Sequence, residues 1–175
     1  EHEAFEVCRY SLFDHADDIA VHPMKHLELR RAGLFTRPWR VLSTGQMVDE
    51  RDGRPFSTEF AHSRFLVPHL AERMGIKAPW ALFCDCDFLF RADVNELFKL
   101  VDRDYAVMVV KHDYRPERGV KMDGVSQYRY ARKNWSSLML WNLDHAANRD
   151  LGTDDVNHRA GDFLHTFAWL DDSLI

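Results

Sequence analysis

The stretch that decides the fold is Trp80-Ala81-Leu82-Phe83-Cys84, which runs directly into Asp85-Cys86-Asp87. Five consecutive apolar residues have the length of a strand, and such a run is typical of a central strand that is covered on both faces. Apolar runs at residues 105–110 and 137–143 predict two further strands. Helical patterns alternate with these strands along the chain. The sequence therefore predicts an α/β domain with a mostly parallel sheet.

Helices are predicted where apolar residues recur at helical spacing, namely at residues 3–15, 25–34, 58–74, 93–101 and 154–168. Ser57 or Thr58 can cap the third of these helices, and Gly33 and Gly75 stand where two of them end. Residues 19–22 read as a short strand and residues 36–55 as a loop. No repeat or linker interrupts the 175 residues, so a single domain is expected.

The charge and the cysteine content exclude several classes of protein. A balance of 23 basic and 28 acidic residues argues against a chain that binds nucleic acid through bulk electrostatics. The longest uncharged apolar runs are far shorter than the roughly 20 residues of a membrane-spanning helix. Three cysteines are too few for a disulfide scaffold, so a reducing, cytoplasmic setting is expected. His62 and His69 belong to no H-E-x-x-H motif and are expected to be partly buried helix residues.

Asp85 and Asp87 form a D-x-D motif at the carboxyl end of the strand predicted at residues 80–84. Ligands of open α/β sheets bind beyond that end of the strands. Carboxylates two residues apart point to the same side of a strand, about 6–7 Å from each other, so one divalent cation could bind between them as the strand turns. All-oxygen ligation favours Mg2+ or Mn2+. The alternative is that both aspartates are solvated residues at a strand end.

Several motifs, in the same order along the chain, resemble the bacterial glycosyltransferases related to glycosyltransferase family 8. They are Ser63-Arg64-Phe65-Leu66-Val67-Pro68, residues 80–89, 93–97, 121–124 and 132–142, and Trp169-Leu170-Asp171-Asp172. The resemblance spans residues 3–175 and implies a GT-A fold, a three-layer nucleotide-diphospho-sugar transferase domain. It also implies a nucleotide-sugar donor, usually a UDP-sugar, Mn2+ or Mg2+ bound at the D-x-D motif, and transfer with retention of configuration. It does not specify whether the acceptor is a glycan, a lipid or a protein.

The resemblance implies a donor site that extends beyond the D-x-D motif. Arg64, on or beside the apolar stripe of its predicted helix, would contact the donor diphosphate or the D-x-D carboxylates; the alternative is an edge arginine that reaches water. Asn134, Ser136 and Ser137 would let the donor approach the backbone; the alternative is that the serines only begin a strand. Asp113 would bind a sugar hydroxyl or serve as a turn residue.

Asp171 and Asp172 match the place where family 8 enzymes have an acidic residue and an amide near the anomeric carbon. Carboxylates at that place would stabilise positive charge on the sugar or orient the acceptor hydroxyl, so both are candidate catalytic residues. An Asp-Asp pair after an aromatic helix is equally often a helix end. The resemblance further implies a first strand before residue 1 and a metal-binding histidine after residue 175, so the chain is expected to be the central portion of the enzyme.

Two other functions remain open from the sequence. Phosphatases of the haloacid dehalogenase type also place D-x-D after an apolar strand, but they continue with Thr or Val where this chain has Leu89, and their motif lies near the start of the chain. A domain that binds a sugar nucleotide or a protein partner without turnover is the non-enzymatic alternative. Slow hydrolysis of a sugar-nucleotide donor would separate an enzyme from a binding module.

Overall fold

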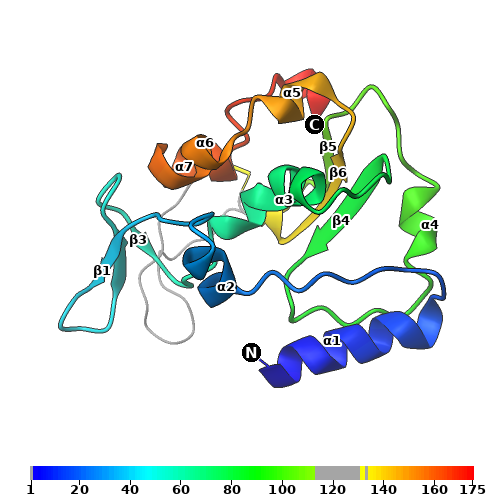
Figure 1. Cartoon of the computed structure of the whole chain (residues 1–175), viewed down its shortest axis with the longest axis horizontal. Coiled ribbons are helices and arrows are strands. Elements are labelled where there is room, and N and C mark those ends of the chain that lie inside the picture. Colours follow the sequence, from blue (N-terminus) through cyan, green and yellow to red (C-terminus); the bar gives the residue numbers. More distant parts are fainter. Residues whose placement is uncertain (1, 113–130, 133) are drawn as a thin grey trace.

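The computed structural model of the protein describes residues 2–112, 131, 132 and 134–175 (Figure 1). The α-helices are α1 (His2–His15), α2 (His26–Arg31), α3 (Val67–Arg73), α4 (Asn95–Phe98), α5 (Ala146–Arg149), α6 (Thr153–His158) and α7 (Gly161–His165). The strands are β1 (Trp39–Val41), β2 (Met47–Asp49), β3 (Pro55–Phe56), β4 (Trp80–Cys84), β5 (Val107–Val109) and β6 (Leu138–Asn142). Short 3-10 helices are η1 (Ser63–Leu66), η2 (Trp135–Ser137) and η3 (Asp172–Leu174).

The central sheet has the strand order β4-β6-β5, and β6 pairs antiparallel with both of its neighbours. Trp80 lies opposite Asn142, and Cys84 lies opposite Leu138. The expectation of a mostly parallel sheet is therefore wrong for the strands that the structure describes. An apolar run indicates that a strand is buried, but it does not encode the direction of the neighbouring strand. The three-layer GT-A assignment stays a prediction.

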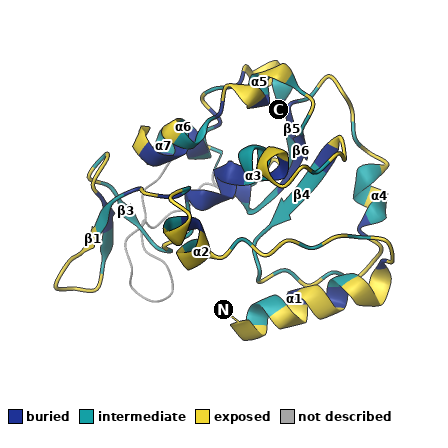
Figure 2. Cartoon of the chain, viewed as in Figure 1, coloured by how far each residue is buried: buried dark blue, intermediate teal, exposed yellow. Residues whose placement is uncertain are grey.

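The hydrophobic core lies around β6, the middle strand of the central sheet. Met139 and Trp141 of β6 are fully buried, and Phe65 of η1 and Phe167 pack into the same cluster. Figure 2 shows this concentration of buried residues on β6 and η1. The strand before the D-x-D motif, β4, is an edge strand of the described sheet. Only its Trp80 is buried, and its other residues are half-buried.

A second sheet, β1-β2-β3, forms in the region that the sequence predicted as a loop. Its strands have at most three residues, which is too short for a periodic pattern. The buried guanidinium of Arg37 donates to Asp49 Oδ2 from Nε at 2.7 Å and from Nη2 at 2.5 Å. Arg37 Nη1 also donates to the carbonyl oxygens of Val156 and Arg159. These bonds join the second sheet, hereafter the hairpin sheet, to α6.

The helix predicted at residues 58–74 begins only at Val67, after the 3-10 helix η1. Pro68 explains the difference, since proline is tolerated in the first turn of an α-helix but would break a helix that began ten residues earlier. Ser57 and Thr58 therefore cap no helix. Gly75, with φ of +67°, follows α3 as expected.

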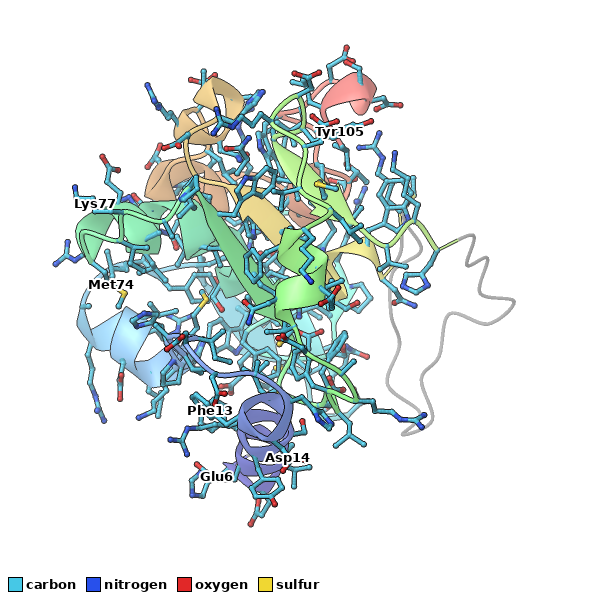
Figure 3. All side chains as sticks on the ribbon, turned by 90° about the vertical axis from the view of Figure 1, so that its right-hand side faces the viewer. Glu6, Phe13, Asp14, Met74, Lys77 and Tyr105 are labelled. Carbon is cyan, nitrogen blue, oxygen red and sulfur yellow. The ribbon has the colours of Figure 1, made fainter. Side chains whose placement is uncertain are left out.

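The N-terminal part of the chain is α1 followed by an extended connection to α2 (Figure 1). Residues 19–22 form no strand, contrary to expectation. Glu6 and Asp14 are exposed on α1, and Phe13 is also partly exposed (Figure 3). None of the described helices has both the length and the apolar character needed to cross a membrane.

Candidate functional site

A polar cavity of about 180 Å3 lies between the hairpin sheet, η1, α7 and the end of β4. Its lining is Asp49, Asp52, Arg54, Pro55, Phe56, Ser57, Thr58, Ala61, His62, Arg64, Asp85, Asn134, Ser136, Ser137, Gly161, Asp162 and His165. Whole drug-sized ligands need about 300 Å3 or more, so the cavity suits one part of a larger ligand, such as a sugar ring or a phosphate.

Antiparallel pairing brings two predicted groups of site residues together at this cavity. Because β4 and β6 run in opposite directions, the end of β4 lies beside the start of β6. The backbone N–H of Asp85 donates to the carbonyl oxygen of Ser137 at 3.0 Å. The sequence placed these residues in one site, but the sheet direction that joins them is the opposite of the expected one.

Arg64 holds the first carboxylate of the D-x-D motif. Its Nη2 lies 2.9 Å from Asp85 Oδ1, and its Nη1 donates to Asp85 Oδ2 at 3.2 Å and to the carbonyl oxygen of Ser136 at 2.9 Å. Only 9% of the Arg64 side chain is exposed, which is incompatible with an edge arginine that reaches water. A guanidinium that touches both oxygens of a carboxylate fixes its orientation as well as its charge.

The structure separates the remaining predicted site residues from this cluster. Asp87 is exposed and does not line the cavity. Asp171 accepts hydrogen bonds from the backbone N–H and the hydroxyl of Ser173, so it caps η3, and the same contacts lower its pKa. Asp172 is exposed and forms an ion pair with Arg132. Asp113 lies outside the described residues.

Short-range signals did not reveal the opposite side of the cavity, which comes from the hairpin sheet and α7. His165 lines it with Nδ1 at 3.2 Å from the Ser136 hydroxyl, and its ring lies edge-on to that of His62, with 5.4 Å between the centroids. Neither histidine stands in a motif, so no sequence signal marked them. Gly161 passes so close that a Cβ there would lie 2.7 Å from His62 Nε2. Any larger residue at this place would force the His62 ring to shift.

His62 is a buried, neutral histidine between two arginines. Burial holds the pKa of His62 well below its usual range, and the positive charges of Arg37 and Arg64 lower the pKa further. His62 Nε2 lies 3.7 Å from Asp49 Oδ2, but Arg37 already neutralises that carboxylate. His62 is thus a fixed, uncharged part of the cavity wall, more deeply buried than the sequence indicated.

We expect the stability of the protein to fall as the pH drops below about 6.5, where an unfolded histidine takes up a proton. The folded pKa of His62 is depressed, so the unfolded state binds more protons in this range and the free energy of unfolding decreases by up to about 1.4 kcal/mol per pH unit. Urea titrations of the wild type and of His62→Gln from pH 8 to pH 5 measure the slope. At pH 8 the difference between the two proteins reports lost packing alone. An unchanged slope in His62→Gln would contradict the prediction.

The cysteines form a group that the sequence did not foresee. Cys8 on α1, Cys84 at the end of β4 and Cys86 lie near enough to one another to affect the pKa values of the Cys8 and Cys84 thiols. Burial raises the pKa of the Cys8 thiol and of the Cys84 thiol. Thiols with raised pKa values react slowly, so this group packs α1 against the D-x-D segment. All three cysteines are free.

A divalent cation at Asp85 and Asp87 would need further oxygen ligands from a bound substrate. Within the described part of the chain, no three His, Cys, Asp or Glu side chains come together in a way that could hold a metal ion. Mg2+ is commonly held by one or two carboxylates together with substrate phosphates. Asp85 and Asp87 match that donor set only when a phosphate-bearing ligand completes it.

Comparison with known proteins shows that the chain is similar in sequence to a plant protein. The chain is 44% identical over 173 residues to protein CDI of Arabidopsis thaliana, an alignment that covers 98% of this chain and 60% of the relative. No family model matches the chain, and neither does any solved structure. The assignment to the bacterial glycosyltransferases related to family 8 is therefore wrong, since the similarity found is to a plant protein. The chain spans about three fifths of the length of that relative.

Proposed function

We propose that the cavity is the reaction centre of a metal-dependent glycosyltransferase that moves a sugar from a nucleotide-sugar donor, such as a UDP-sugar, to an acceptor. The observation that supports this most directly is the Arg64–Asp85 ion pair at the end of β4, with Ser136 and Ser137 beside it on the same cavity. An oriented carboxylate at a strand end, next to hydroxyl groups, suits a ligand that combines phosphate with a sugar. Retention of configuration rested only on the family resemblance and is not part of the proposal.

Asp85 and Asp87 would hold Mn2+ or Mg2+ together with oxygens of the donor diphosphate. When bound, such a cation supplies positive charge where the leaving diphosphate becomes negative. Arg64 contributes before any donor arrives, because it fixes the Asp85 carboxylate in one orientation. We assign no step to Asp171 or Asp172, since Asp171 caps η3 and Asp172 pairs with Arg132. The free cysteines accord with the cytoplasmic setting that we propose for this enzyme.

The phosphatase alternative fits the Asp85 environment less well. That mechanism needs the first aspartate of D-x-D as a nucleophile, whereas here both of its carboxylate oxygens contact Arg64. A guanidinium on both oxygens withdraws electron density from the carboxylate and lowers its nucleophilicity. Turnover of p-nitrophenyl phosphate that disappears in Asp85→Asn would nevertheless establish the phosphatase and remove our proposal.

Calorimetric titration of the protein with UDP, in Mn2+ and separately in EDTA, tests the donor site. We expect UDP to bind at least about tenfold more tightly with Mn2+, because the cation links the phosphates to the D-x-D carboxylates. Asp87→Asn should lose this metal-dependent gain and keep the weaker binding seen in EDTA. Asp93→Asn is the matched control, since Asp93 is also exposed and close in sequence, and asparagine can still accept the hydrogen bond from the N–H of Asn95.

Two results would count against the proposal. Equal affinity for UDP with and without Mn2+ would remove the metal site. An Asp87→Asn variant that behaves like Asp93→Asn would remove Asp87 from it. If metal-dependent binding is present, slow release of UDP from UDP-sugars distinguishes an enzyme from a module that binds the donor without turnover.

A further inference from the structure

The cavity has a second wall, which comes from other segments of the chain than the Arg64–Asp85 pair. We use the name acceptor wall for Phe56, Ser57, Thr58, Asp52 and Asp162, which follow β3, lie in the hairpin sheet or begin α7. Long-range bonds fix this wall in place. The Gly161 N–H donates to Asp52 Oδ2 at 2.8 Å, and Arg54 forms an ion pair with Asp162.

Three polar side chains at the cavity have no hydrogen-bond partner within the described part of the chain. No hydrogen bond joins the side chain of Ser57, Thr58 or Asn134 to any residue that the structure describes. Hydroxyl and amide groups both donate and accept hydrogen bonds. A ligand that uses both capacities donates as well as accepts, as the hydroxyl groups of a sugar do, whereas a phosphate dianion could use only the donors.

The carboxylates of the acceptor wall and the neighbouring Asp49 are already held by contacts within the protein. Arg37 neutralises Asp49, and Arg54 pairs with Asp162. Asp52 accepts backbone N–H groups from Arg54 and Gly161, and His62 is neutral. The wall therefore offers no excess positive charge to attract an anionic acceptor, and its only aromatic ring, that of Phe56, is too small an apolar surface for a lipid chain.

We infer that the acceptor wall binds the acceptor substrate, and that this acceptor is a neutral carbohydrate. The inference rests on the proposed function. In the transfer, the bond from the sugar C1 to the phosphate oxygen breaks and its electron pair leaves with the diphosphate. A hydroxyl oxygen of the acceptor forms the new bond to C1, and its proton passes to the departing diphosphate. Donor and acceptor must meet in one cavity. This one has Asp85 of the D-x-D motif on one side and, on the other, the hydroxyl groups of Ser57 and Thr58, which have no hydrogen-bond partner among the described residues.

Amide NMR spectra of the protein test this assignment with maltose, cellobiose and xylobiose as neutral probes. We expect at least one of them to shift the amide signals of residues 56–58 and 161–162. Ser57→Ala combined with Thr58→Val should weaken that binding by about tenfold, since it removes two hydrogen-bonding hydroxyl groups. Ser43→Ala combined with Thr44→Val is the matched control, because it makes the same changes at an exposed turn of the same sheet, outside the cavity.

Titrations with UDP and UDP-glucose distinguish a failure of the acceptor assignment from a failure of the proposed function. UDP with Mg2+ should shift the signals of Asp85 and Ser136 equally in the wild type and in the Ser57/Thr58 variant. If that response persists while none of the disaccharides shifts the acceptor wall, the acceptor assignment is overturned and the proposed function stands. If UDP-glucose shifts Ser57 and Thr58 but UDP does not, the wall holds the donor sugar instead, and the assignment is again overturned. Loss of the UDP response in the wild type would remove the proposed function itself.

Discussion

Arg37→Met should lower the free energy of unfolding by about 3–5 kcal/mol, the range expected when one partner of a buried ion pair is removed. The side chains of Arg37 and Asp49 are 2% and 3% exposed, so the Asp49 carboxylate would keep its charge without access to water. The carbonyl oxygens of Val156 and Arg159 would lose their donor as well. Urea unfolding at pH 7, followed by tryptophan fluorescence, measures the effect.

Two further variants show whether the buried charge is the cause. Arg40→Met changes an exposed arginine of β1 and should alter stability by less than about 0.5 kcal/mol. Adding Asp49→Leu to Arg37→Met removes the orphaned carboxylate, so the double variant should be more stable than Arg37→Met alone. A double variant that is less stable by the full sum of the two single losses would show that the carboxylate is not the source of the penalty.

Long-range contacts such as the Arg37–Asp49 ion pair and its bonds to α6 explain why the sequence did not reveal the hairpin sheet. The sheet is held by contacts between residues that are far apart in the chain, such as the 2.7 Å bond from the N–H of Thr36 to Asn157 Oδ1. The sequence pattern around a polar residue does not identify the distant residue with which it forms a hydrogen bond. The strands β4, β5 and β6 were predictable because each is a local apolar run, whose burial depends on composition rather than on a distant partner.

The candidate site also contains residues that the sequence could predict and residues that only the tertiary structure reveals. Asp85 could be proposed from the sequence because it follows a recognisable apolar strand. The proposal of Arg64 rests on its place on or beside an apolar stripe together with the family resemblance, and that of Ser136 on the resemblance alone. The structure then gives Arg64 a definite contact with the Asp85 carboxylate. His165 and Thr58 could not be proposed, because only tertiary folding brings α7 and the end of β3 to the cavity.

The family assignment failed for a related reason. Motifs such as D-x-D or an Asp-Asp pair after an aromatic helix are short, and each has a structural explanation that needs no common ancestry. Asp171 illustrates this, since its contacts with Ser173 make it a cap of η3. Identity of 44% along nearly the entire chain is a much stronger signal, and it points to a plant protein. The chemistry of the cavity therefore has to be argued from its own contacts.

Arg64→Met should weaken the binding of UDP in Mn2+ by about a hundredfold. Arg64 fixes the Asp85 carboxylate through both of its oxygens, and its removal takes away these two orienting contacts. Each lost charge-assisted hydrogen bond costs about 1.5–3 kcal/mol, and about 1.4 kcal/mol corresponds to a factor of ten in affinity. Titration calorimetry of the folded variant measures the loss, and Arg73→Met, an exposed arginine at the end of α3, is the matched control.

The metal dependence of that loss decides how Arg64 acts. If Arg64 only positions Asp85, then Arg64→Met reduces UDP affinity in Mn2+ and leaves the weaker affinity in EDTA unchanged. If Arg64 also contacts the diphosphate, both affinities fall. A double-mutant cycle with Asp85→Asn adds a second criterion, because residues in contact should show a coupling of about 0.5–3 kcal/mol in Mn2+. The structure favours positioning, since its Nη atoms already contact Asp85 and the Ser136 carbonyl oxygen. Additive losses would contradict that role.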